Sequence, residues 1–265
     1  MNRYSVFIVL GLAWTCSGSN AQTKMSPLDQ MLWTRPRHVA DWTWVKQPWK
    51  GNSKPYVRIA HQINVAFTDK KRIEAVTQRY RAAAEAKPTD PLAVYAWGYA
   101  AYVARPLGAT IAYKDLPKLR RALALPKNPK TYEFSRLRFV IIVRSAPYAE
   151  LKPLGYALLK REPNDHDVLQ GMVNLLAPGS PLEQGQAVGY AQRLVQLHPN
   201  LSTSYASLGW AYNLIFAKHK DVAAGDKAVA AYHQAVALSD YPQGRRNVQY
   251  FIDRIQQMQK QLRRS

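Results

Sequence analysis

Apolar residues recur at helical spacing along most of this chain, and the pattern is most regular in Asn200–Pro242. In the first half of this stretch, Tyr205 and Tyr212 share one face of a predicted helix. After a short break, Ala228 and Tyr232 share one face of a second predicted helix. The spacing therefore predicts two consecutive helices that pack through their apolar faces.

Small residues lie among the larger ones on these two faces. Gly209 in the first helix and Ala235 in the second allow a close approach, while Tyr212 and Tyr232 fill the remaining space. This order of aromatic, Leu-Gly, tyrosine and alanine positions resembles the tetratricopeptide repeat, a helix–turn–helix unit with a period of about 34 residues. The chain departs from that family in the longer break between the helices and in Asp240, which replaces the usual closing proline.

The same pattern continues on the N-terminal side of this pair. Trp97 and Gly98 repeat part of the family signature in an earlier helix, and Pro163 and Pro199 end two successive pairs at about the family period. The predicted pairs begin at residues 56, 90, 131, 165 and 200, and their second helices begin at residues 68, 115, 148, 181 and 225. The resemblance implies an all-α fold, an α-solenoid of about five such pairs in residues 56–240.

The helix predicted for residues 131–144 matches the family least well. It lacks the Leu-Gly step, and its run FVIIV is rich in β-branched residues, which taken alone is compatible with a strand. The helical segments on both sides and the repeat period favour a helix. We therefore expect a buried helix at this position.

A final helix is predicted in residues 241–265, where it would cap the end of the repeats. Val248, Ile252 and Ile255 begin an apolar stripe that continues to Leu262. The cations of this segment can occupy the other faces of the helix: Arg245, Arg246, Arg254, Lys260, Arg263 and Arg264.

Residues 1–21 have the layout of a secretory signal peptide, with a short basic start, an apolar run and small residues before the expected cleavage site. The apolar run, residues 6–14, is too short to span a membrane. Cys16 raises the alternative of a lipid anchor, but the bulky Trp14 fits such a signal poorly. We therefore expect cleavage after Ala21, which would leave an exported chain, periplasmic or secreted, with no cysteine and no transmembrane segment.

Residues 22–55 differ in composition from the rest of the chain. Four tryptophans lie among lysines, arginines and prolines: Trp33, Trp42, Trp44 and Trp49. We favour the interpretation that this segment is an N-terminal cap that seals the apolar end of the first repeat. The alternative is an aromatic and basic surface that stacks on sugars, bases or a peptide.

The chain is strongly basic, with 37 Lys+Arg against 17 Asp+Glu and a formal net charge of +20. Such a charge attracts polyanions, so an anionic envelope polymer, nucleic acid or an anionic lipid surface is the alternative class of partner. Its densest segment predicts a basic patch formed by Lys118, Arg120, Arg121, Lys127, Lys130, Arg136 and Arg138.

No residue pattern indicates catalysis, a cofactor or a metal site, so we expect a protein that is not an enzyme. The six histidines are scattered through the sequence, and no His-Glu-x-x-His motif occurs. The group most similar to a metal cluster is Asp165-His166-Asp167. We interpret it as a helix start, because acidic side chains cap free amides and favour the positive end of the helix dipole.

The resemblance also predicts where a partner would bind. In the family, the first helix of each pair lines a concave groove, which implies a protein or peptide partner for this chain. The matching positions are Tyr95, Tyr99, Tyr102, Gln170, Asn174, Trp210 and Asn213. For the three tyrosines, packing between neighbouring helices is an equally supported alternative.

Overall fold

The computed structural model describes residues 54–65, 70–104, 116–125, 128–143, 148–239 and 242–264, and every regular element in these ranges is a helix. The helices are α4 (Lys54–Val65), α5 (Lys70–Ala86), α6 (Pro91–Ala104), α8 (Leu116–Leu123), α9 (Tyr132–Ile142), α10 (Tyr148–Arg161), α11 (His166–Leu176), α12 (Pro181–Leu197), α13 (Ser202–His219), α14 (Val222–Leu238) and α15 (Pro242–Leu262). The predicted signal peptide and tryptophan-rich segment, up to residue 53, lie outside the described residues.

The helix starts follow local signals in the sequence. Ser180 caps α12 through a capping box with Glu183, and Pro181 occupies the first turn. Asp221 caps α14 by accepting a hydrogen bond from the backbone N–H of Ala224 at 3.1 Å. The predicted starts of the paired helices lie within a few residues of the observed ones. The prediction of a long break in the last pair is wrong, because α13 continues to His219 and Asp221 caps α14, which leaves only Lys220 and Asp221 between the two helices.

The β-branched run FVIIV is helical, as predicted from its surroundings. Thr131 caps α9, and its hydroxyl accepts a hydrogen bond from the N–H of Phe134. Phe139, Val140 and Ile141 are all buried, so this helix is covered on several sides. Burial on several sides explains why α9 lacks a narrow apolar stripe.

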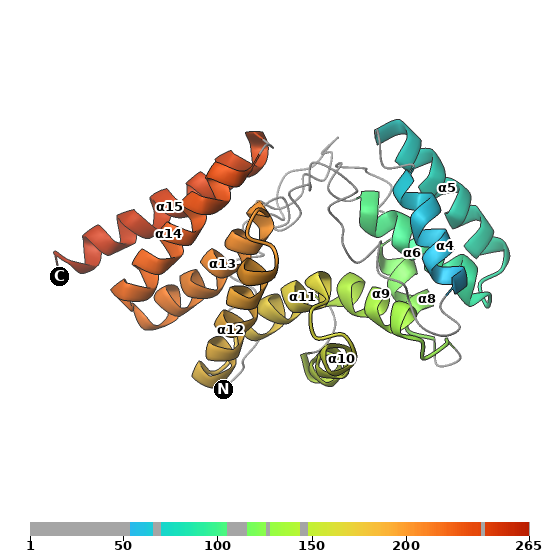
Figure 1. The fold of residues 1–265 in the computed structure, drawn as a ribbon, viewed down its shortest axis with the longest axis horizontal. Coiled ribbons are helices and arrows are strands. Elements are labelled where there is room, and N and C mark those ends of the chain that lie inside the picture. Colours follow the sequence, from blue (N-terminus) through green and yellow to red (C-terminus); the bar gives the residue numbers. More distant parts are fainter. Residues whose placement is uncertain are drawn as a thin grey trace.

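From α5 onward each helix packs against its neighbours in sequence, whereas α4 packs mainly on α6 rather than on α5; α4, α6, α9, α11 and α13 also contact one another in that order. Figure 1 shows the chain advancing from α4 and α5 at one side of the molecule to α14 and α15 at the other, with α9 and α11 between them. The all-α fold with packing of adjacent helices is therefore confirmed. No helix in the described ranges is both long and apolar enough to cross a lipid bilayer.

Glycines mark the closest approaches between helices. A Cβ on Gly171 of α11 would lie 2.5 Å from Cε1 of Phe139, and one on Gly155 of α10 would lie 2.9 Å from Cε2 of the same ring. A Cβ on Gly209 of α13 would lie 2.4 Å from Cδ1 of Tyr232 on α14. The prediction that Gly209 lies where a second helix approaches closely is confirmed.

Candidate functional site

A buried cluster of polar side chains surrounds the start of α11. Asp165 precedes this helix in an extended conformation, and its Oδ1 accepts hydrogen bonds from the backbone N–H groups of Asp167 at 3.0 Å and Val168 at 3.1 Å. The interpretation of Asp165-His166-Asp167 as a helix start is confirmed. Asp165 is 7% exposed, so these bonds lie in the interior of the protein.

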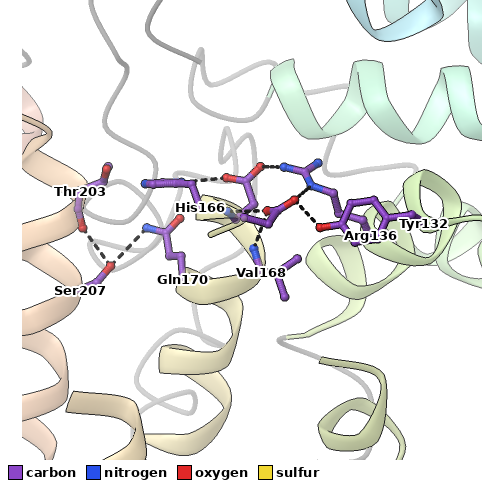
Figure 2. Close-up of polar contacts among 9 residues, drawn as sticks. Tyr132, Arg136, His166, Val168, Gln170, Thr203 and Ser207 are labelled. Carbon is purple, nitrogen blue, oxygen red and sulfur yellow. Dashed lines mark hydrogen bonds and ion pairs between the residues drawn. The ribbon is translucent and has the colours of Figure 1, made fainter. Parts of the chain in front are cut away.

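The second oxygen of Asp165 joins α11 to α9. Its Oδ2 accepts hydrogen bonds from the hydroxyl of Tyr132 at 2.7 Å and from Nε of Arg136 at 2.6 Å. Nη2 of the same guanidinium donates to Oδ2 of Asp167. Figure 2 shows Tyr132 and Arg136 extending from α9 toward the two carboxylates at the start of α11. One buried cation therefore bridges two carboxylates, and we call these four side chains the Arg136 cluster.

The electrostatics of the Arg136 cluster favour the charged forms. Burial opposes ionisation of Asp167, but the Arg136 guanidinium, with hydrogen bonds from His166 and Tyr102, holds the pKa of that carboxyl well below its usual range. Burial likewise opposes the charge on Arg136, but Asp165 and Asp167 raise its pKa. Because Tyr102 belongs to α6, the cluster connects three first helices of the predicted pairs, α6, α9 and α11.

The donors and acceptors in the Arg136 cluster are largely committed to one another. Both oxygens of Asp165 accept two hydrogen bonds, and Arg136 is 3% exposed. Within the described part of the chain, no group of three His, Cys, Asp or Glu side chains is placed to hold a metal ion. The role that this geometry supports is to fix the positions of α6, α9 and α11.

Two histidines lie beside the cluster, where the start of α11 meets the end of α12. Their rings pack edge to face with centroids 5.1 Å apart, and Nδ1 of His166 lies 3.1 Å from Oδ1 of Asp167. Burial, together with the charge of His166, lowers the pKa of His198 from 6.5 to about 4. His198 is therefore neutral in the folded protein near neutral pH.

This shift predicts a loss of stability in mild acid. The unfolded chain binds a proton on His198 near pH 6.5 and the folded chain only near pH 4, so stability falls as the pH drops through that window. We expect His198 to account for about 1 kcal/mol of the free energy of unfolding lost across this window, because the side chain is only half-buried and solvent screens its charge. Urea unfolding above and within the window should show a smaller acid loss for His198→Gln, and an unchanged loss would contradict the assignment.

The three tyrosines predicted to line a ligand groove lie in the core instead. Tyr95 and Tyr102 are each 4% exposed, and Tyr99 is fully buried. The ring of Tyr95 packs edge to face on Tyr56 of α4, with centroids 4.9 Å apart, and also neighbours Phe134 of α9. All three tyrosines therefore pack between neighbouring helices, which was the alternative to the ligand groove, and a ligand has no access to their rings in this structure.

The remaining groove residues lie on α11 and α13, which contact each other. Gln170 is buried, and its Nε2 donates to Oγ of Ser207, whose hydroxyl donates to the carbonyl of Thr203 at 2.9 Å. Figure 2 shows this link between the two helices. Three residues are partly exposed, and we refer to these positions of α11 and α13 together as the α11–α13 face: Asn174, Trp210 and Asn213.

The residues of the α11–α13 face differ in their local contacts. The side-chain oxygen of Asn174 is shielded from solvent and accepts no hydrogen bond. Trp210 packs edge to face on Phe251 of α15, with centroids 6.4 Å apart. Asn213 lies beside the buried hydroxyl of Tyr232. Trp210 is therefore the best placed of the three to contact a ligand, because the Asn174 oxygen is shielded and Asn213 lies beside Tyr232.

The predicted basic patch is smaller than its sequence suggests. Arg136 does not belong to it, because this side chain is buried between two carboxylates. Arg120 and Arg138 are partly buried, and Nζ of Lys118 lies 3.5 Å from Oε1 of Glu85. Arg121 and Lys130 are exposed, whereas Lys127 lies outside the described residues.

Sequence reasoning did not identify the Arg136 cluster. A usable signal was present, because Arg136 lies in the mostly apolar segment Tyr132–Ile142 and one turn after Tyr132. A buried charge in such a segment needs a buried partner of opposite sign.

Comparisons of the chain with protein-family models, curated proteins and solved structures found no match.

Proposed function

We propose that this protein is a non-enzymatic scaffold that binds a protein or peptide partner. In this proposal the helices form an α-solenoid of tetratricopeptide-like pairs, capped by α15, and the partner lies on the α11–α13 face. The observation that supports it best is the direct contact between α11 and α13, the first helices of two successive predicted pairs. The signal-peptide pattern of residues 1–21 supports an exported location, periplasmic or secreted.

The chemistry of the α11–α13 face suits a peptide. Trp210 offers a large apolar surface that loses little conformational entropy when a ligand covers it. Asn174 is partly exposed, and the N–H groups of its amide can donate to the backbone carbonyls of an extended chain, whereas its side-chain oxygen is shielded from solvent. The Gln170–Ser207 hydrogen bond holds α11 against α13, so the face is organised before a ligand arrives.

Peptide selection on the full-length chain provides the test. Peptides selected from a display library would be measured by fluorescence polarisation against the original protein, Trp210→Ala and Asn174→Ala. We expect Trp210→Ala to weaken binding by more than about 1 kcal/mol, as is typical of a central aromatic anchor. Gln192→Ala, an exposed position on α12, is the control and should bind like the original protein.

Stability must be measured in parallel, because Trp210 also packs on Phe251. Asn174→Ala removes an amide without opening the α13–α15 contact, so its effect on binding does not depend on that packing. If both variants bind the selected peptides like the original protein, the α11–α13 face is not the binding site. Binding that disappears at high salt in all proteins would instead favour an anionic partner.

A further inference from the structure

Helix α15 and the two residues after it carry a high density of exposed cations. Val248, Ile252 and Ile255 are buried on the side of α15 that faces the protein. Outside this buried stripe, six cations of α15 and of the two residues after it are exposed, some of them at the edge of the stripe: Arg245, Arg246, Arg254, Lys260, Arg263 and Arg264. We call these six cations, with the exposed Tyr250, the α15 basic face.

Most of this charge is not neutralised within the protein. In the described ranges, five of the six cations form no ion pair: Arg245, Arg254, Lys260, Arg263 and Arg264. The acid of this segment, Asp253, accepts a hydrogen bond from Nε2 of Gln249 at 2.8 Å rather than from a cation. Like charges on one helix repel each other, and only Lys260, Arg263 and Arg264 at the C-terminal end gain from the helix dipole, so helix stability does not account for the whole arrangement. The arrangement does provide a site for an anion.

Tyr250 lies in the middle of this charge. Its side chain is 54% exposed, which is high for a large aromatic residue. It is one helical turn from Arg246 on one side and from Arg254 on the other. A tyrosine with an accessible ring and a polar tip suits the boundary between an apolar phase and water.

The shape of the α15 basic face indicates the kind of anion. Arg245 and Arg254 are nine residues apart, which places them on opposite flanks of the exposed half of the helix. A narrow polymer along one stripe would contact only some of these cations. A flat anionic surface can engage all of them, because long arginine side chains reach toward a plane from the flanks of a helix.

Among the described helices, α15 lies at one end of the fold. In Figure 1, α15 lies at the end of the molecule opposite α4 and α5, and its main contacts are with α14. Tyr250 is the single large apolar side chain that α15 exposes within its described residues. A helix that exposes many cations and a single large apolar side chain binds a bilayer through its charge, at the level of the headgroups, and does not insert into the hydrocarbon.

We propose that the α15 basic face adsorbs to the headgroup surface of an anionic phospholipid bilayer. The α11–α13 face is formed by other helices, so a membrane-bound molecule could still hold a partner there. This inference is independent of the proposed peptide binding and goes beyond it.

Vesicle co-sedimentation of the full chain tests the proposal. We expect binding to phosphatidylcholine vesicles that contain phosphatidylglycerol, weak binding to pure phosphatidylcholine, and a decline in binding as salt rises. The variant Arg245→Gln/Arg254→Gln/Lys260→Gln should bind the anionic vesicles about one hundredfold more weakly, because each cation near such a surface contributes about fivefold in affinity. Tyr250→Ala should weaken binding severalfold without changing the salt dependence.

A matched control separates the α15 basic face from the overall charge. Lys87→Gln/Arg121→Gln/Lys160→Gln removes three exposed cations from α5, α8 and α10 or their ends, so its net charge equals that of the first variant. It should retain nearly all vesicle binding. Attachment through the apolar run of residues 6–14 would appear equally with neutral vesicles and in every variant. Melting temperatures of both triple variants would show that the fold is retained.

Three results would overturn the proposal. Equal losses in the two triple variants would show that net charge, not the α15 basic face, attracts the vesicles. Equal binding to neutral and anionic vesicles would exclude charge as the cause. Binding of polyuridylate through α15 without binding of vesicles would identify a soluble polyanion as the partner. Because the α15 variant should bind selected peptides normally, failure here would leave the proposed function untouched.

Discussion

Replacing Arg136 with methionine is expected to lower the free energy of unfolding by about 3–5 kcal/mol. The variant would leave Asp165 and Asp167 buried without their cation, and Asp165 would retain only the hydrogen bonds of its cap and of Tyr132. Methionine fills much of the arginine stem volume, so the loss would reflect the charge more than a cavity. Urea unfolding monitored by circular dichroism would measure it.

The neighbouring Arg138 provides a matched control. It lies two residues further along α9, is partly buried, and its Nε donates no hydrogen bond. Arg138→Met should therefore change the free energy of unfolding by less than about 1 kcal/mol. If the two substitutions had equal effects, the ion pairs of Arg136 would not matter for stability.

The pH dependence of the Arg136 variant gives a second readout. In the original protein the pKa of Asp167 is depressed, so its contribution to stability is complete above the unfolded pKa and is lost as the pH falls. Without Arg136, burial would raise the pKa of Asp167. Protonation of this carboxylate in acid would then remove the free-energy cost of burying its unpaired charge. The difference in stability between the two proteins should therefore shrink as the pH is lowered from neutral. A constant difference would indicate a loss of packing alone.

The helices were predictable because their signals are local. Turn signals such as Ser180-Pro181 and stops such as Pro163 fix the boundaries without reference to the rest of the fold, whereas the cap Asp221 was missed and the start of α14 was predicted three residues late. Close packing at Gly209 was also predictable, since a glycine on an apolar helical face between aromatic residues indicates a near neighbour. The FVIIV run required more than local propensity, and its helical neighbours gave the correct result.

The site was harder to predict because it depends on contacts distant in sequence. Arg136 meets Asp165 and Asp167 about 30 residues later, and composition alone placed this arginine on the surface. Periodicity correctly put Tyr95 and Tyr99 on one helical face, but it does not reveal what covers that face. Here α4 and α9 lie over it, so tyrosines expected at a groove became core residues.

Gly209→Ala should lower the free energy of unfolding by about 1–3 kcal/mol, although alanine is the better helix former. The new Cβ would lie 2.4 Å from the Tyr232 ring, a distance that requires one helix or the ring to move. The ring is fully buried and stacks on Phe251 with centroids 5.9 Å apart, so its displacement would disturb the contact between α14 and α15 as well. Chemical unfolding with a tyrosine or tryptophan fluorescence signal would measure the loss.

Gly185 of α12 makes the matched comparison, because a Cβ there meets nothing within 4 Å. Gly185→Ala should raise the free energy of unfolding by about 0.5–1 kcal/mol through helix propensity alone. The two substitutions are chemically identical and both lie inside helices, so the difference between their effects isolates the approach of α13 to α14. If Gly209→Ala proved as stabilising as Gly185→Ala, these helices would have to lie further apart than in this structure. The contact between α14 and α15 through the stacked rings of Tyr232 and Phe251 would then require a different arrangement of these helices.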